Sequence, residues 1–311
     1  MKTAILFVSA LLLSLSMVSP AVAQESDVVH DTWSIGAPMP KAVLGPAAAA
    51  FGYGIYVVGG GDWRSRGIVN TQIYYPASDA WSRGVPVPAP LLNGVAAVAN
   101  NVLYVFGGAE RSTFLNTVWA FDPQTKMWAA KSPMPTARES AAAVVKNNIV
   151  YVIGGWNNAR VSNVESYDPA TDTWTEETPL LSGQSNLIGA LIGDWIVIAD
   201  GFTDYGQTGD IEGLNPLTNA WRRGTPDPAL RDWACGGSIG SELYVAGGYY
   251  GPVLTVTDSF NALTNTWTRL ADIPQTTLGA GSSVYRGKLY CFGGSGTDGG
   301  TLLNNVQIYQ P

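Results

Sequence analysis

The sequence predicts an all-β fold in which six homologous four-stranded units follow one another along the chain. Two unrelated markers carry the prediction: a tryptophan and a glycine doublet, both of which recur at intervals of 46 to 48 residues. The composition agrees with it, because 36 glycines and only 13% charged residues suit short strands joined by tight turns. Repetition at such a period is typical of architectures assembled from one supersecondary unit.

The markers occupy fixed columns of the repeat. The repeated tryptophans are Trp33, Trp81, Trp128, Trp174, Trp221 and Trp267. The doublets are Gly59–Gly60, Gly107–Gly108, Gly154–Gly155, the variant Asp200–Gly201, Gly247–Gly248 and Gly293–Gly294. Three residues before them stand Tyr56, Tyr104, Tyr151, Val197, Tyr244 and Tyr290. Pairs such as Asn100–Asn101, which tolerate positive φ, precede the doublets and predict two-residue hairpins.

Each unit reads as four strands in order. A run of small residues such as Ala47–Ala50 comes first, and after the hairpin follows an apolar strand ending in the doublet, as in Leu103–Gly108. A third strand carries an aromatic residue, as in Val118–Pro123, and a fourth begins at the tryptophan. Small side chains on the first strand are expected where the units crowd around a central axis. The tryptophan and the third-strand aromatic then fill the wider space farther out.

The doublet, the spaced tryptophan and the turns Phe121–Pro123 and Tyr167–Pro169 resemble kelch repeats. The resemblance covers the chain from about Trp33 to its end, and it implies a six-bladed β-propeller with one four-stranded antiparallel blade per repeat. The last repeat stops where its tryptophan strand should begin, and Trp33 precedes the first complete repeat. We therefore expect the N-terminal strand to complete the last blade.

The fourth repeat departs most from the pattern. It has Asp200 for the first glycine, Val197 for the tyrosine and Leu214 for the third-strand aromatic. We interpret these changes as drift at tolerant positions rather than as a functional change.

The first 23 residues predict a cleavable secretory signal peptide. Lys2 is followed by the apolar run Ala4–Val18 and by Ala21–Ala23, which suits cleavage after Ala23. Residues 24–311 are then one propeller domain of a secreted or periplasmic protein. The apolar run is too short to span a bilayer, and no later segment is apolar enough. Because a propeller closed by its own terminus leaves no frayed repeat, we expect a monomer.

Composition restricts the chemistry. A formal net charge of −7 disfavours nucleic acids and anionic membranes as partners. With His30 as the only histidine, we expect no metal site and no cofactor. Cys235 and Cys291 could pair in an oxidising compartment. Since both lie in strand-like apolar runs of different repeats, we expect two buried thiols instead.

Candidate ligand-binding residues lie in the loops after the doublets and before the small-residue strands, which should share one face. Aromatic rings beside arginine, asparagine and aspartate suit a sugar or a peptide, and the arginines could clamp a carboxylate or sulfate. In an alternative interpretation, the pairs Arg138–Glu139, Arg231–Asp232 and Glu110–Arg111 only neutralise one another. The candidates are Trp63, Arg64, Arg111, Arg138, Glu139, Trp156, Asn157, Asp204, Tyr205, Arg231, Asp232, Trp233 and Tyr249.

The function we expect first is that of a binding module for a carbohydrate or a protein. The alternative is a cofactor-free sugar epimerase or mutarotase in which Glu139 or Asp232 acts as the base, with Arg138 and Arg231 beside it. Its support is an architectural resemblance to exported kelch proteins that isomerise sialic acid. A purely structural docking ring is the third class.

Overall fold

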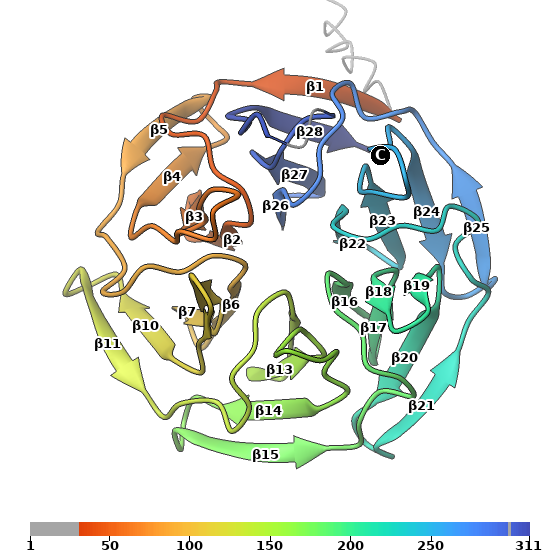
Figure 1. The fold of residues 1–311 in the computed structure, drawn as a ribbon, viewed down its shortest axis with the longest axis horizontal. Coiled ribbons are helices and arrows are strands. Elements are labelled where there is room, and N and C mark those ends of the chain that lie inside the picture. Colours follow the sequence, from red (N-terminus) through yellow and green to blue (C-terminus); the bar gives the residue numbers. More distant parts are fainter. Residues whose placement is uncertain (1–30, 298–299) are drawn as a thin grey trace, which may run out of the picture.

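A computed structural model, which describes residues 31–297 and 300–311, confirms the six-bladed β-propeller. Six four-stranded antiparallel sheets stand around a central axis (Figure 1). The predicted signal peptide lies outside the described residues. No helix within those residues is long and apolar enough to cross a membrane.

Chain order and blade order coincide. Blade 1 contains β2 (Ala47–Phe51), β3 (Gly54–Val58), β4 (Thr71–Tyr75) and β5 (Ala80–Arg83). Blade 2 contains β6 (Val95–Ala99), β7 (Val102–Phe106), β10 (Val118–Asp122) and β11 (Met127–Lys131). Blade 3 contains β12 (Ala142–Lys146), β13 (Ile149–Ile153), β14 (Val164–Asp168) and β15 (Thr173–Glu177).

The second half repeats this order and closes the ring. Blade 4 contains β16 (Ile188–Ile192), β17 (Trp195–Ala199), β20 (Ile211–Asn215) and β21 (Ala220–Arg223). Blade 5 contains β22 (Cys235–Ile239), β23 (Glu242–Ala246), β24 (Thr257–Asn261) and β25 (Thr266–Arg269). Blade 6 contains β26 (Gly281–Tyr285), β27 (Lys288–Phe292), β28 (Val306–Gln310) and β1 (Thr32–Gly36).

The expected closure is therefore confirmed. Strand β1 pairs antiparallel with β28, with Trp33 opposite Tyr309, so the first described strand is the outermost strand of the last blade. The Trp33 indole packs at a tilt against the Tyr309 ring, with centroids 5.1 Å apart, and its Nε1–H donates to the carbonyl of Ala271 in blade 5. The closing strand is thus held to two blades.

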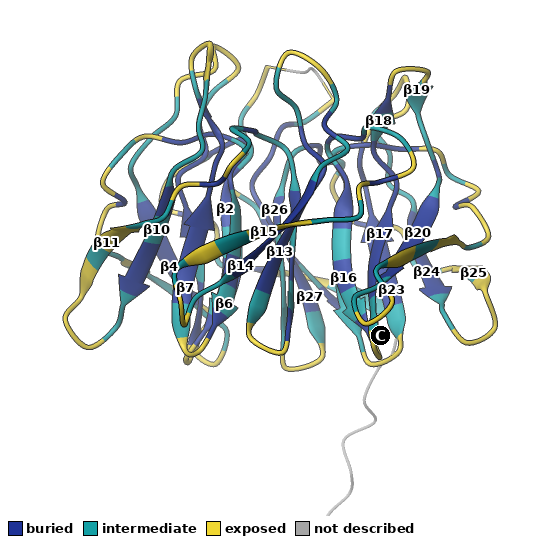
Figure 2. Ribbon diagram, turned by 90° about the horizontal axis from the view of Figure 1, so that it is seen from below, coloured by how far each residue is buried: buried dark blue, intermediate teal, exposed yellow. Residues whose placement is uncertain are grey.

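The two faces of the ring differ in their loops (Figure 2). Short hairpin turns lie on one face. Taller loops, which connect the second strand to the third and each blade to the next, lie on the other, here called the loop face. Two small hairpins extend it: β8 (Ala109–Glu110) with β9 (Thr113–Phe114), and β18 (Phe202–Thr203) with β19 (Gly206–Gln207).

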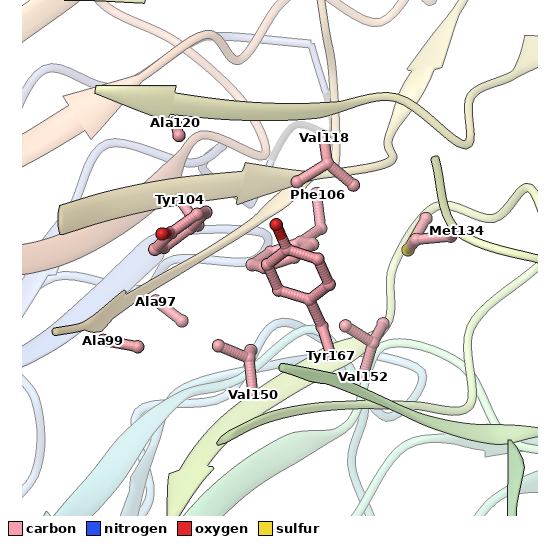
Figure 3. Close-up of a cluster of buried hydrophobic side chains, with 10 residues drawn as sticks. All are labelled: Ala97, Ala99, Tyr104, Phe106, Val118, Ala120, Met134, Val150, Val152 and Tyr167. Carbon is pink, nitrogen blue, oxygen red and sulfur yellow. The ribbon is translucent and has the colours of Figure 1, made fainter. Parts of the chain in front are cut away.

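The apolar core lies between blades. Between blades 2 and 3, Tyr104 and Phe106 from β7 pack against Tyr167 from β14 (Figure 3). The Tyr104 and Tyr167 ring centroids are 5.7 Å apart. Repeating such a junction around the ring explains why the aromatic columns recur, because each column supplies one side of every blade–blade contact.

The expectation of two free thiols is wrong. Cys235 on β22 and Cys291 on β27 form a disulfide that joins blade 5 to blade 6. Their Cα atoms are 5.9 Å apart, within the usual range for a bridge. Sequence spacing placed the two residues in consecutive blades but did not show that their side chains face each other across the junction.

Candidate functional site at the mouth of the central cavity

A cavity of about 470 Å³ runs along the propeller axis. Small side chains on the six inner strands make room for it, as expected from the small-residue column; Ala48, Ala143, Gly189 and Ser282 are examples. Small residues of the inner strands line the cavity, and its surface is more polar than apolar. Polar groups collect where the loops enter it on the loop face.

At that entrance, six homologous loop residues form a closed ring of backbone hydrogen bonds, here called the mouth ring. Each N–H donates to the carbonyl of the corresponding residue in the preceding blade, at 2.8 to 3.3 Å. All six adopt φ between +55° and +64°, which favours glycine and asparagine over most other residues. The members are Gly45, Asn93, Ser140, Asn186, Trp233 and Gly279.

The residue before each ring member is fixed by a second contact. Glu139 pairs with Trp156, and Asp232 with Tyr249, through isolated antiparallel bridges. At Gly155 a Cβ would lie 2.7 Å from the Glu139 carbonyl, so the doublet's second glycine permits this approach. The repeat thus places two carboxyl side chains at matching positions in blades 3 and 5.

Both carboxyls are held by the mouth ring. Asn93 donates to Oε2 of Glu139 at 3.0 Å, and Asn186 donates to Oδ2 of Asp232 at 3.1 Å. Burial raises the pKa of Glu139 against the opposing effect of the Asn93 hydrogen bond. Burial raises the pKa of Asp232 to about 6, opposed by hydrogen bonds from Asn186 and Gln207. Asp232 can therefore exchange a proton near neutral pH.

Two indoles stack on each other beside the mouth ring. Trp63, from blade 1, stacks on Trp233, from blade 5, with ring centroids 6.3 Å apart. Trp63 also donates its Nε1–H to Oγ of Ser295 in blade 6, at 3.3 Å. A Cβ at Gly279 would lie 2.5 Å from Cε3 of Trp233, so a glycine there gives the indole its place. With 41% of its surface exposed, Trp63 offers an accessible aromatic face.

Arg160 supplies a positive charge close to Asp232. Its guanidinium lies over the rings of Phe202, at 4.4 Å, and Trp156, at 5.2 Å, and it pairs with Asp204 at 2.9 Å. The charge of Arg160 also lowers the pKa of Asp232, though less than burial raises it. Blades 3, 4 and 5 therefore contribute to one polar and aromatic surface.

The two arginines expected to clamp a ligand lie elsewhere. Arg138 is 1% exposed and pairs with Glu165 at 2.6 Å, while it donates to the carbonyls of Gly154 and Asn163. The expectation that it stands on the loop face is wrong, because a strand-embedded carboxylate draws it between the strands. It does not pair with Glu139 either.

Arg231 is likewise 0% exposed. It pairs with Asp227 at 2.8 Å, with Asp258, and with Asp200 at 3.5 Å. The expectation that Arg231 is exposed on the loop face is therefore wrong as well. Of the three ion pairs considered in the alternative interpretation, only Glu110–Arg111 forms, at 3.6 Å. Asp200, which the sequence analysis interpreted as a change at a tolerant position, is one of the buried partners of Arg231.

The remaining candidates stay at the surface of the loop face but do not converge. Arg64 and Arg111 are exposed on blades 1 and 2, and Tyr205, on the β18–β19 turn, is 99% exposed. Asn157 is half-buried within its own turn, donating to the carbonyl of Ala159. Tyr249 reaches the mouth beside Asp232.

Sequence reasoning did not single out Asn93, Asn186, Arg160 or Gln207 among its candidates. For the two asparagines a signal existed, because Gly45, Asn93, Asn186 and Gly279 occupy one column of residues that tolerate positive φ. For Gln207 none existed, since only the β18–β19 hairpin brings it back to Asp232. No group of three or more metal-ligating side chains is gathered for an ion in residues 31–297 and 300–311.

Comparison with known families gives two matches. The model described as the KLHDC2/KLHL20/DRC7 Kelch-repeats domain matches residues 26–186, about half of the chain. The model described as the Kelch motif matches residues 234–274, in blade 5. No curated protein matches the sequence.

Proposed function

The chain belongs to the kelch-repeat family, and from that premise we propose that it is a binding module whose mouth ring and surrounding side chains hold a segment of a partner protein. Kelch propellers are typically protein-interaction modules. The observation that carries the proposal is the composition of the loop face around the mouth ring. Two stacked indoles and two carboxyls bonded to Asn93 and Asn186 lie there, beside the entrance of a cavity of about 470 Å³.

The chemistry of the mouth favours a particular kind of segment. Backbone groups of the mouth ring are already bonded to one another, so recognition depends on side chains. Trp63 and Trp233 offer apolar ring surface, whereas Glu139 and Asp232 accept hydrogen bonds. A segment with an apolar side chain for the indoles and a hydroxyl or basic group for the carboxyls satisfies both.

A display library of short peptides screened against the full chain tests this proposal. Enriched peptides should bind wild-type protein and lose at least tenfold in affinity when Trp63→Ala and Glu139→Gln are combined. Tyr53→Ala is the matched control, because Tyr53 is exposed on the hairpin turn Gly52–Tyr53 of the opposite face. Peptides that bind the double variant as well as wild type would place the binding surface elsewhere.

One observation supports a second candidate function, the isomerisation of a bound sugar with Asp232 as the base. Asp232 has a pKa of about 6, near the value that suits a general base at neutral pH, and aromatic faces are close to it. Arg138 and Arg231 would have no part in it, because both are buried. Accelerated anomer exchange that disappears in Asp232→Asn would favour this candidate; binding of sugars without turnover would leave a carbohydrate-binding module.

We also propose that the protein acts outside the cytoplasm. The apolar leader ending at Ala23 supports this, and so does the Cys235–Cys291 disulfide, since such bridges persist in oxidising compartments. Expression with the native leader should yield a mature protein beginning at Gln24 in the exported fraction, as read by mass spectrometry of its N-terminus.

A further inference from the structure

The junction between blades 4 and 5 contains a second cavity, of about 280 Å³, that shares no lining residue with the central one. Strands β20 and β21 of blade 4 and β24 of blade 5 border it, and these blades are neighbours in the ring (Figure 1). Its apolar lining includes Val197, Ile211 and Phe260, which are buried, and Leu263, which is 85% exposed at the rim.

The repeat explains why this cavity exists. In blades 1, 2, 5 and 6, a tyrosine on the second strand packs against the third-strand aromatic of the next blade, with centroids 5.6 to 6.1 Å apart. Figure 3 shows one such filled junction, between Tyr104 and Tyr167. Blade 4 has Val197 at the tyrosine position, facing Phe260, so the ring that fills the other junctions is missing here.

A second position in the same blade enlarges the space. On β20, Gly213 stands where β4 and β28 have Ile73 and Ile308. The nearest side-chain neighbours of a Cβ at Gly213 belong to Trp195, which packs against the cluster of Val197 and Phe260, and to Arg222, which lines the cavity. Both substitutions therefore remove side-chain volume from the same side of one blade.

Arg222, at the rim of this cavity, carries a positive charge that no acidic side chain pairs with in the described residues. The Arg222 guanidinium lies 3.7 Å from the centroid of the Trp195 ring, and no salt bridge engages it in the part of the chain that the structure describes. Its neighbour Arg223 differs, because it pairs with the buried Glu212. A guanidinium can lie over an indole face and still donate N–H groups to a carboxylate.

We propose that this cavity, here called the junction pocket, binds an aromatic ring that carries a carboxylate a few bonds away. The ring occupies the place of the missing tyrosine against Phe260, and Arg222 holds the carboxylate at the rim. An apolar cavity of roughly 150 Å³ is enough for a benzene ring. The junction pocket, of about 280 Å³, has room for a phenol ring against its apolar residues and for a short polar chain near Arg222, Arg223 and Asn265, which also line it. Free aromatic acids and peptides that end in tyrosine share this chemistry.

Ligand titration of the full chain, followed by NMR of the probe, tests the proposal. The probe 3-(4-hydroxyphenyl)propionate should bind wild-type protein, and Val197→Tyr, which restores the tyrosine of the repeat, should weaken its binding at least tenfold. Val197→Phe is the second filling variant, in case the tyrosine hydroxyl is not accommodated. Wild-type protein that does not bind the probe, or filled variants that bind it unchanged, would overturn the proposal.

A second experiment tests whether Arg222 binds the carboxylate of the ligand. Arg222→Gln should weaken the binding of 3-(4-hydroxyphenyl)propionate about tenfold and leave p-cresol, which has no carboxylate, unchanged. Equal loss for both probes would refute a carboxylate contact. Tighter binding of the peptide Gly-Gly-Tyr than of the free acid would identify a chain end as the natural source. Trp63→Ala with Glu139→Gln should not affect these titrations, which separates the junction pocket from the mouth.

Discussion

At the scale of single residues, the carboxyl of Asp232 connects the geometry of the mouth to a measurable property. Its pKa of about 6 exceeds the ordinary value of 3.8, so the folded protein binds this proton more tightly than the unfolded chain does. The stability that comes with protonation is complete below about pH 4 and is lost as the pH rises through 6.

Asp232→Asn should therefore stabilise the protein at neutral pH and not in acid. Removing the buried charge should raise the free energy of unfolding by about 3 kcal/mol at pH 7.5, and the difference from wild type should become small near pH 4. Urea denaturation at both pH values measures it. Glu176→Gln, at an exposed position, is the control, and an increment that does not depend on pH would contradict the explanation.

Arg231 shows how a residue suited to ligand binding can serve the core instead. Arg231→Met leaves the carboxylates of Asp200 and Asp227 buried without their cation, and leaves Asp258 with only Arg269, at 3.8 Å. We expect a loss of about 3 to 5 kcal/mol in unfolding free energy, because an uncompensated buried charge is strongly destabilising. The exposed Arg64→Met should change stability little, and a similarly small effect of Arg231→Met would contradict the buried-cluster interpretation.

At the scale of elements, the disulfide between β22 and β27 is the single covalent cross-link between side chains of different blades in the described residues. Replacing Cys235 and Cys291 together by serine should lower the free energy of unfolding by about 2 to 4 kcal/mol, because the unbridged chain gains conformational freedom when unfolded. Thermal unfolding with and without reductant measures it. Reductant should destabilise wild type and leave the double variant unchanged; equal sensitivity would mean that the bridge contributes little.

The position of a residue within the repeat determines whether its place in the site could be predicted from the sequence. Glu139, Asp232 and Trp233 fall in a loop column whose position follows from the repeat period, so their common face was predictable. The burial of Arg138 and Arg231 was not, because it depends on Glu165 and Asp258, which enter from the third strand of the same blade. The direction of a long side chain such as arginine depends on its ion-pair partners, and the position of its loop in the repeat does not reveal them.

At the scale of the whole molecule, closure of the ring by β1 makes the chain's ends interdependent. Trp33→Ala and Trp128→Ala remove homologous indoles, whose Nε1–H groups bond Ala271 and Val85. Each should lower the unfolding free energy by about 3 kcal/mol through lost packing. Only Trp33→Ala loosens the closing strand, so it should also unfold several-fold faster in stopped-flow mixing with denaturant. Equal unfolding rates would mean that closure does not control opening of the ring.

The sequence by itself determined the number of blades, their strand order and the strand that closes the ring, because these follow from the period and phase of local patterns. Only the tertiary structure decided the Cys235–Cys291 bridge, the burial of two arginines, the mouth ring and the junction pocket at Val197. Each of these arises where separate segments meet. A repeat in the sequence shows what every blade has in common, but contacts between blades depend on what a particular pair of neighbours has gained or lost.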